Sequence, residues 1–184
     1  LTLANLREPR DITPWYGPAR GFNFEREVQP VLDKFCVACH DGHVDQQGRM
    51  VMDLRGRERI TDYTSAYHYG GTDAGHFSTS YVALHRLVRR PGLESDYHVL
   101  MPLEFHADTT DLVQLLARGH YNVKLDAEAW DRLITWIDLN APFHGTWTEI
   151  AGRDRVAPYA ARRRELRMLF NGLDDDPEAI PPVS

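Results

Sequence analysis

The sequence predicts a mainly α domain with long loops and an extended N-terminal arm. Apolar residues recur at helical spacing in several stretches of the 184-residue chain. The middle of the chain is rich in Gly, Ser and Thr, which indicates loops. The first 23 residues contain three prolines and no clear period, as in an arm lying on a core. We therefore expect an arm at 1–23, one domain at 24–172 and a linker-like tail at 173–184.

The first predicted helix leads into residue 36. Val28, Leu32 and Phe35 recur at helical spacing, with Val31 on the same side. Pro30 is tolerated only in the first turn of such a helix. The pattern therefore predicts a short helix that ends at the first cysteine.

The middle third is harder to interpret. VMDLRG, at 51–56, suits a strand or a short extended segment, and YHYGGTDAGHFSTS, at 67–80, suits a loop. YVALHRLVRR, at 81–90, predicts a helix that is stopped by Pro91 and Gly92.

The last third predicts three helices. Asp108 or Thr109 is the expected N-cap of the first, and Gly119 ends it. Asp126 is the expected N-cap of the second, whose apolar face lies at i, i+3, i+4 and i+7, and Asn140 and Pro142 close it. That face consists of Trp130, Leu133, Ile134 and Ile137. The third is expected at 159–171.

Composition excludes two classes of partner. The formal net charge is -6, and the basic triplet Arg162 to Arg164 suits a solvated helix face, so nothing indicates nucleic-acid binding. No run of eighteen apolar residues occurs, so the chain encodes no membrane span.

The stretch FCVACHDGH, at 35–43, contains both cysteines of the chain. A thioredoxin-like pair needs a βαβ context, which is missing, and a zinc site needs four ligands. The spacing Cys-x-x-Cys-His is the attachment signature of a c-type haem. It predicts one covalent haem c, with thioethers at Cys36 and Cys39 and His40 as the proximal iron ligand.

Several segments resemble a known family. REVQPVLDKFCVACHDG resembles the haem-attachment segment of planctomycete-type cytochrome c domains, and GHYNVKLDAEAWDRLITWIDLNAPFHGTW resembles their closing segment. With PWYGPARGF upstream and RRRELRMLFNGLDDDPE downstream, the chain looks most like the haem-bearing C-terminal part of hydrazine synthase alpha-subunit-like proteins. The similarity runs from about Pro14 to Glu178, but 44–100 match nothing in the family.

The resemblance implies a cytochrome c-like helical haem domain in a periplasmic or extracytoplasmic location. It implies electron transfer with a redox partner protein or a neighbouring haem domain. It does not imply hydrazine synthesis, because that chemistry depends in the family on a multi-haem complex and this chain has one Cys-x-x-Cys-His. The arm and tail lead us to expect that the chain belongs to a longer polypeptide or complex.

The sixth iron ligand is less determined. His120 is the preferred distal ligand, because Gly119 lets the chain turn sharply there, and in the resembling bis-histidine domains the histidine of this Gly-His pair is the distal ligand. Its alternative role is to cap a helix C-terminus. Met101, in a Met-Pro pair, is the second candidate. The other candidates are His106, His98, His76 and His68, and an open site would favour catalysis.

Further residues are candidates for the haem surroundings. Phe35 and Trp130 are expected to wall the pocket, and Trp136 to cover the haem edge or bind a propionate. The candidate propionate partners are Arg20, Arg118 and Lys124. The aromatic loop of Tyr63, Tyr67, His68 and Tyr69 either packs on the core or forms a docking surface.

The predicted function is one-electron transfer with His40/His120 ligation. One alternative is the haem domain of a larger oxidoreductase acting on small nitrogen compounds. The other alternative is a binding module in which a haem or a metal ion links long loops.

Overall fold

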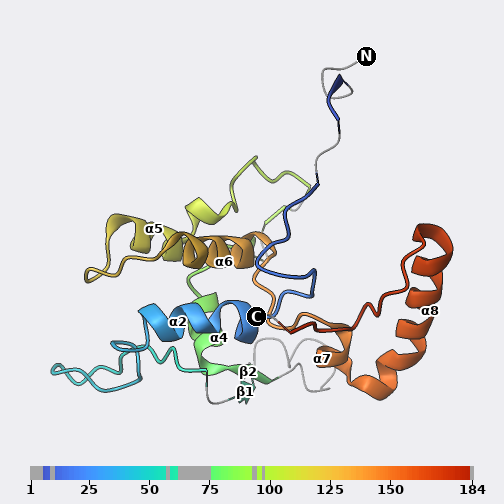
Figure 1. The fold of residues 1–184 in the computed structure, drawn as a ribbon. Helices are drawn as coiled ribbons and strands as arrows, with labels where there is room; N and C mark the ends of the chain where they lie inside the picture. Colours follow the sequence, from blue (N-terminus) through green and yellow to red (C-terminus); the bar gives the residue numbers. More distant parts are fainter. Residues whose placement is uncertain are drawn as a thin grey trace.

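The computed structural model describes residues 6–8, 11–56, 59–61, 76–92, 95–96 and 98–182. Its architecture is mainly helical, as predicted, with one small two-stranded sheet in the described part (Figure 1). The elements in chain order are α1 (Phe24–Glu27), α2 (Gln29–Phe35), β1 (Arg59–Thr61), β2 (His76–Ser78), α4 (Thr79–His85), η2 (Ala107–Thr109), α5 (Asp111–Arg118), α6 (Ala127–Asp138), α7 (Trp147–Ala151) and α8 (Arg153–Asn171). No helix among these described residues is long and apolar enough to cross a membrane.

The helix before the cysteines is formed by α1 and α2. Asn23 caps α1 by accepting a hydrogen bond from the backbone N–H of Arg26 at 3.1 Å. Pro30 lies in the first turn of α2, where its missing N–H costs little. Cys36 is the C-cap of α2, so the predicted run of helix into the first cysteine is confirmed.

The segment after His40 folds back as an extended loop. Isolated antiparallel bridges pair Asp41 with Asp53 and Val44 with Met50. The backbone N–H of Leu54 then donates to the carbonyl of His40 at 2.9 Å. Residues 51–56 are therefore a short extended segment, which was one of the two expectations for VMDLRG.

The expected loop at 67–80 is wrong at its C-terminal end. Residues 76–78 form β2, which pairs antiparallel with β1. Ser78 then caps α4, because its hydroxyl accepts a hydrogen bond from the Tyr81 N–H at 3.2 Å. Residues 67–75, together with the predicted aromatic loop of Tyr63, Tyr67, His68 and Tyr69, lie outside the described residues.

The expected helix at 81–90 is also displaced. α4 starts earlier, at Thr79, and ends at His85 instead of continuing to the proline. The N–H groups of Leu87 and Val88 turn back to carbonyls three residues earlier, so the last turn tightens and the helix stops.

α5 and α6 follow the predicted pattern, except at one cap. The N-cap of α5 is Thr110, which is fully buried, because Asp108 and Thr109 belong to the preceding 3₁₀ turn η2. Gly119 ends α5 as expected. Asp126 caps α6, accepting from the N–H of Ala129 at 2.8 Å, also as expected.

A cluster of aromatic residues forms the centre of the core. The ring centroids of Phe24 and Trp136 lie 5.3 Å apart, and those of Tyr81 and Phe143 lie 5.0 Å apart. The Trp136 indole N–H donates to the Pro142 carbonyl at 3.1 Å, and this side chain is fully buried. Trp136 is therefore a core residue, and the expectation that it covers a cofactor edge or binds a propionate is wrong.

The C-terminal region contains more helix than the sequence indicated. α7 was not predicted, although Thr146 and Glu149 form a capping box at its start. α8 begins at Arg153 and passes through Pro158, whereas the expected helix began after that proline. Only Val156 of α8 is buried, and α8 stands apart from α2, α5 and α6 (Figure 1).

The tail has no helix or strand in its described part. Asp174 and Asp175 pair with Arg164 and Arg167 at 2.6 Å and 2.5 Å. Glu178 accepts a hydrogen bond from the Thr148 N–H at 2.8 Å. The tail therefore lies against α7 and α8.

Candidate functional site

Two histidines that are far apart in the sequence meet in the structure. The ring centroids of His40 and His120 lie 5.8 Å apart, and the ring planes are inclined by 23°. His40 sits in the turn that continues α2, with its N–H bonded to the Cys36 carbonyl at 2.9 Å. His120 follows Gly119 at the end of α5. The structure thus brings the predicted proximal and distal ligands together.

This separation suits two imidazoles that share one metal ion. Metal–nitrogen bonds of about 2 Å on each side, with roughly 1 Å from each nitrogen to its ring centre, put the centroids roughly 6 Å apart. No hydrogen bond joins the two rings in the described structure, so the backbone around each histidine holds them in place.

The ring of His40 is held in the neutral form that binds metals. Burial, and next the like charge that His120 can carry, lower the pKa of His40, while the Met52 backbone raises it slightly. The Nδ1 atom of His40 is buried and has no hydrogen bond of good geometry. The Met52 backbone nevertheless lies within reach of the ring. A backbone carbonyl beside one ring nitrogen favours a proton there and leaves the other nitrogen free to act as a ligand.

The loop that supplies Met52 depends on a glycine. Gly42 has φ +77°, and a Cβ placed there would come within 2.9 Å of an oxygen of Asp53. The loop can therefore close against His40 only with glycine at this position. Sequence reasoning singled out neither Met52 nor Gly42, although a glycine two residues after His40 is a usable signal for a tight return of the chain.

A strained turn presents His120. Gly119 has φ +97°. Tyr121 and Asn122 have φ +45° and +65°, and the Val123 N–H donates to the His120 carbonyl at 2.8 Å, as in a type I′ turn. Left-handed conformations are rare for a residue as bulky as tyrosine, and such strain concentrates at functional sites. The turn therefore holds His120 in place, and its neighbours Tyr121 and Asn122 take left-handed backbone conformations that are unfavourable for them.

The two cysteines are free and unequal. Cys36 is half-buried and Cys39 is exposed, and no disulfide joins them. Burial raises the pKa of the Cys36 thiol to about 11. Redox-active Cys-x-x-Cys pairs need a lowered thiol pKa, so this pair does not suit thioredoxin-like chemistry.

A structural zinc site is not supported by the side-chain positions either. Across the described ranges, no group of three or more His, Cys, Asp or Glu side chains converges closely enough to hold a metal ion. Structural zinc needs four such ligands around one point. The paired imidazoles of His40 and His120 suit a metal ion whose remaining ligands come from a cofactor.

The two predicted wall residues lie near this site. Phe35 is half-buried at the end of α2, and the Lys34 ammonium lies 4.7 Å from its ring centroid. Trp130, on α6, lines a cavity of about 620 Å³ beside the His120 turn. The other lining residues are Leu116, Ala117, Gly119, Tyr121, Asn122, Val123, Lys124 and Leu125. Lys124, one of the predicted propionate partners, therefore lies in the cavity wall beside the His120 turn.

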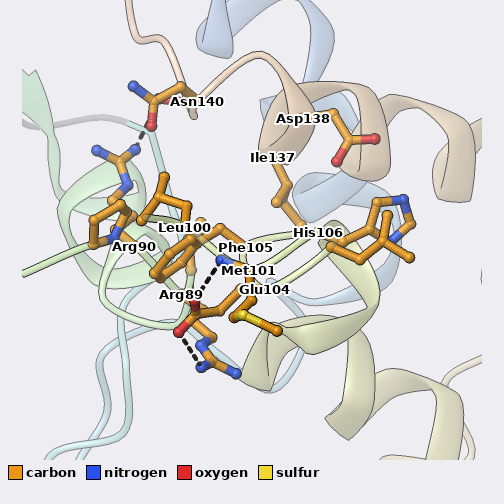
Figure 2. Close-up of a pocket in the computed structure, with 13 residues that line it drawn as sticks. Arg89, Arg90, Leu100, Met101, Glu104, Phe105, His106, Ile137, Asp138 and Asn140 are labelled. Atoms are coloured by element: carbon orange, nitrogen blue, oxygen red, sulfur yellow. Dashed lines mark hydrogen bonds and ion pairs between the residues drawn. The ribbon is translucent and has the colours of Figure 1, made fainter. Parts of the chain in front are cut away.

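The alternative ligands Met101 and His106 lie elsewhere. Both line a second cavity, of about 690 Å³, together with Ile137 and Asp138 at the C-terminal end of α6 (Figure 2). The cavity beside the His120 turn lies instead at the N-terminal end of α6, and a helix of this length spans about 18 Å. Neither side chain is therefore grouped with His40.

The remaining alternatives do not join the site. The His98 side chain is 96% exposed and pairs with Asp96. The side chains of His76 and His68 are outside the described part of the chain. Of the histidine and methionine candidates whose side chains are described, His120 is the one whose ring faces His40.

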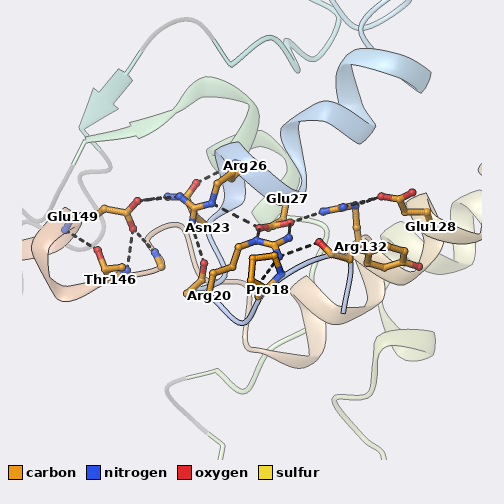
Figure 3. Close-up of polar contacts among 12 residues, drawn as sticks. Pro18, Arg20, Asn23, Arg26, Glu27, Glu128, Arg132, Thr146 and Glu149 are labelled. Atoms are coloured by element: carbon orange, nitrogen blue, oxygen red, sulfur yellow. Dashed lines mark hydrogen bonds and ion pairs between the residues drawn. The ribbon is translucent and has the colours of Figure 1, made fainter. Parts of the chain in front are cut away.

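Arg20 is occupied by a different partner. Its guanidinium binds both carboxylate oxygens of Glu27, at 2.6 Å and 2.8 Å (Figure 3). Arg132 from α6 binds the same carboxylate, which is 1% exposed. Burial raises the pKa of Glu27, but the two guanidiniums outweigh it and hold the pKa below its usual value. The expectation of Arg20 as a propionate partner is wrong, because it ties the arm to α1 and α6.

Comparisons with protein-family models, with curated proteins and with solved structures returned no match to this chain. The candidate site therefore rests on its own residues and geometry.

Proposed function

We propose that this chain is a monohaem c-type cytochrome domain that transfers single electrons. One haem c is attached through Cys36 and Cys39, with His40 and His120 as axial ligands. The observation that carries the proposal is the pair of facing imidazoles, 5.8 Å apart, one of which directly follows Cys-x-x-Cys. Haem iron supplies a reversible one-electron couple when it is bound.

The residues of this chain have distinct roles in the proposal. The C-terminal end of α2 places Cys36 and Cys39 on one turn, because the N–H groups of Cys39 and His40 both bond to the Cys36 carbonyl. Burial lowers the pKa of His40 and keeps that imidazole neutral, the form that binds a metal. The type I′ turn directs the His120 ring toward the His40 ring.

Two protein ligands favour electron transfer over catalysis. With His40 and His120 both holding the iron, no position would remain open for a substrate, unlike in haem enzymes with one protein ligand. Bis-histidine ligation also gives a lower potential than His/Met ligation. We infer a redox partner protein or a neighbouring haem domain as the electron donor or acceptor, and a periplasmic or extracytoplasmic location, where covalent haem is attached.

The visible spectrum of the protein tests this proposal. The protein should be produced with the haem-attachment machinery, denatured, extracted with acidified organic solvent, and measured oxidised and reduced. We expect haem that stays with the polypeptide, sharp reduced bands and no Met–iron charge-transfer band. A colourless protein would overturn the haem assignment. A covalently bound but high-spin haem would overturn the bis-histidine ligation and favour an oxidoreductase.

A further inference from the structure

A second cavity lies apart from the histidine pair. Three segments line its volume of about 690 Å³: residues 88–91, which follow α4, residues 100–106, and the end of α6. Figure 2 shows Arg90 and Asn140 on one side of this space and Ile137, Asp138 and His106 on the other. Its size is in the range of small-molecule sites.

Arg90 has an unused donor in this cavity wall. One of its terminal nitrogens donates to the Asn140 carbonyl at 2.9 Å, which fixes the guanidinium in place. Its Nε is buried and has no hydrogen-bond partner. A guanidinium is always charged and its N–H groups only donate. Among the described residues the Asn140 carbonyl is its one acceptor, so the Arg90 guanidinium in the cavity wall can still donate to an incoming group. The preferred acceptor of an arginine fork is an oxyanion.

The neighbouring charges do not already supply that oxyanion. Glu104 faces Arg89, with its carboxylate 3.4 Å from that guanidinium. His106 is bonded to Asp108 at 2.8 Å. Asp138 lies with Ile137 and His106, on the side opposite Arg90 (Figure 2). The Arg90 side of the cavity is therefore the place for an incoming anion, and the Asp138 side is not.

The rest of the lining is apolar. Val88 and Ile137 form buried parts of the wall, and Leu100, Met101 and Leu103 are exposed at 41%, 67% and 72%. Soluble proteins leave such clustered apolar side chains open mainly at binding sites. A ligand for this cavity would cover these side chains with an apolar body.

We propose that this cavity binds an organic anion, with a carboxylate or sulfonate group at Arg90 and an apolar body against Leu100, Val88 and Ile137. The inference is independent of the haem proposal, because it uses no residue of the histidine site. It would stand if the domain held no haem.

Isothermal titration calorimetry with 1-anilinonaphthalene-8-sulfonate tests the site. This probe combines a sulfonate with an apolar aromatic body, and N-phenyl-1-naphthylamine has the same body without the anion. We expect one saturable site for the sulfonate and at least tenfold weaker binding of the neutral amine. Equal binding of the two compounds, or no saturable binding, would overturn the proposal.

Two variants and their controls locate the binding. Arg90→Met should weaken sulfonate binding at least tenfold, whereas Arg162→Met, at an exposed arginine of α8 that pairs with Glu165, should leave it unchanged. Leu100→Asp should also weaken it, because a carboxylate then repels the anion, and it stays informative if Arg90→Met fails to fold. Its control is Leu139→Asp, at a 52% exposed residue that does not line the cavity. Unchanged affinity in both Arg90→Met and Leu100→Asp would overturn the assignment.

Discussion

The imidazoles of His40 and His120 lie with their ring centroids 5.8 Å apart, although His40 follows α2 and His120 follows α5, far along the chain. Neither ring is hydrogen-bonded to the other in the described structure, and each lies next to a glycine-dependent segment. Gly42 lets the return loop close on His40, and Gly119 starts the turn that presents His120. The arrangement is therefore built by the backbone, as expected where two ligands must be positioned before a cofactor binds.

Replacing His120 by alanine should change the spin state of the proposed haem. With one axial ligand removed, we expect the low-spin spectrum of the holoprotein to become high-spin, read by visible absorption and electron paramagnetic resonance. His98→Ala is the matched control, because His98 is 96% exposed and pairs only locally with Asp96. A low-spin spectrum retained in His120→Ala would exclude His120 as the ligand.

Removing the cysteines should release the haem in steps. Cys36→Ala or Cys39→Ala leaves one thioether, and the double variant leaves none. We expect the double variant to lose its haem completely on acid extraction, with mass spectrometry of the polypeptide as the measurement. Each single variant should show less covalent haem than the parent protein. Full covalent attachment in the double variant would show that neither cysteine forms the bond.

Glu27→Gln should destabilise the domain by about 3 kcal/mol, because it leaves the guanidiniums of Arg20 and Arg132 buried without their anion. Urea unfolding at pH 7 measures this. Glu128→Gln is the control, because Glu128 is 53% exposed and its pairing with Arg132 at i,i+4 contributes only about 0.3 kcal/mol. A loss no larger than that of the control would show that the cluster contributes little.

The same carboxylate predicts a dependence on pH. The pKa of Glu27 is lower in the folded than in the unfolded protein, so its stabilising effect is complete above the unfolded value of about 4.3. The effect is lost as the pH falls through the lower, folded value. The difference in unfolding free energy between the parent protein and Glu27→Gln should therefore be full at pH 7 and shrink below about pH 4. A difference that grows on acidification would contradict this sign.

Gly119→Ala should disturb the distal ligand. Gly119 has φ +97° and ψ 127° with open space around its Cα, so an alanine would strain the backbone without a clash, at about 2 kcal/mol. Gly48→Ala is a close control, because Gly48 has φ +76° and is equally open. We expect a loss of thermal stability in each, but a partly high-spin spectrum of the proposed haem only in Gly119→Ala. Identical spectra in the two variants would mean that the turn does not position the ligand.

Local signals in the sequence predicted several features well. The helix into Cys36 and the α6 helix follow from apolar spacing, and the caps at Asp126 and Gly119 follow from side-chain and backbone chemistry within a few residues. The cap at Thr110 was missed because the preceding residues form a 3₁₀ turn. The small sheet was missed because its pairing joins β1 to β2 across a long connection, which no local period reveals.

By itself, the sequence determined the attachment chemistry that we propose, because the two cysteines and His40 lie on a single turn whose spacing is set by covalent geometry. It could not choose among the other histidines, since each was a local possibility. Only the tertiary structure decided that the ring of His120 faces His40 and that Arg20 binds Glu27. Those choices depend on how α2, α5 and α6 pack, and packing is fixed by contacts between residues distant in the chain.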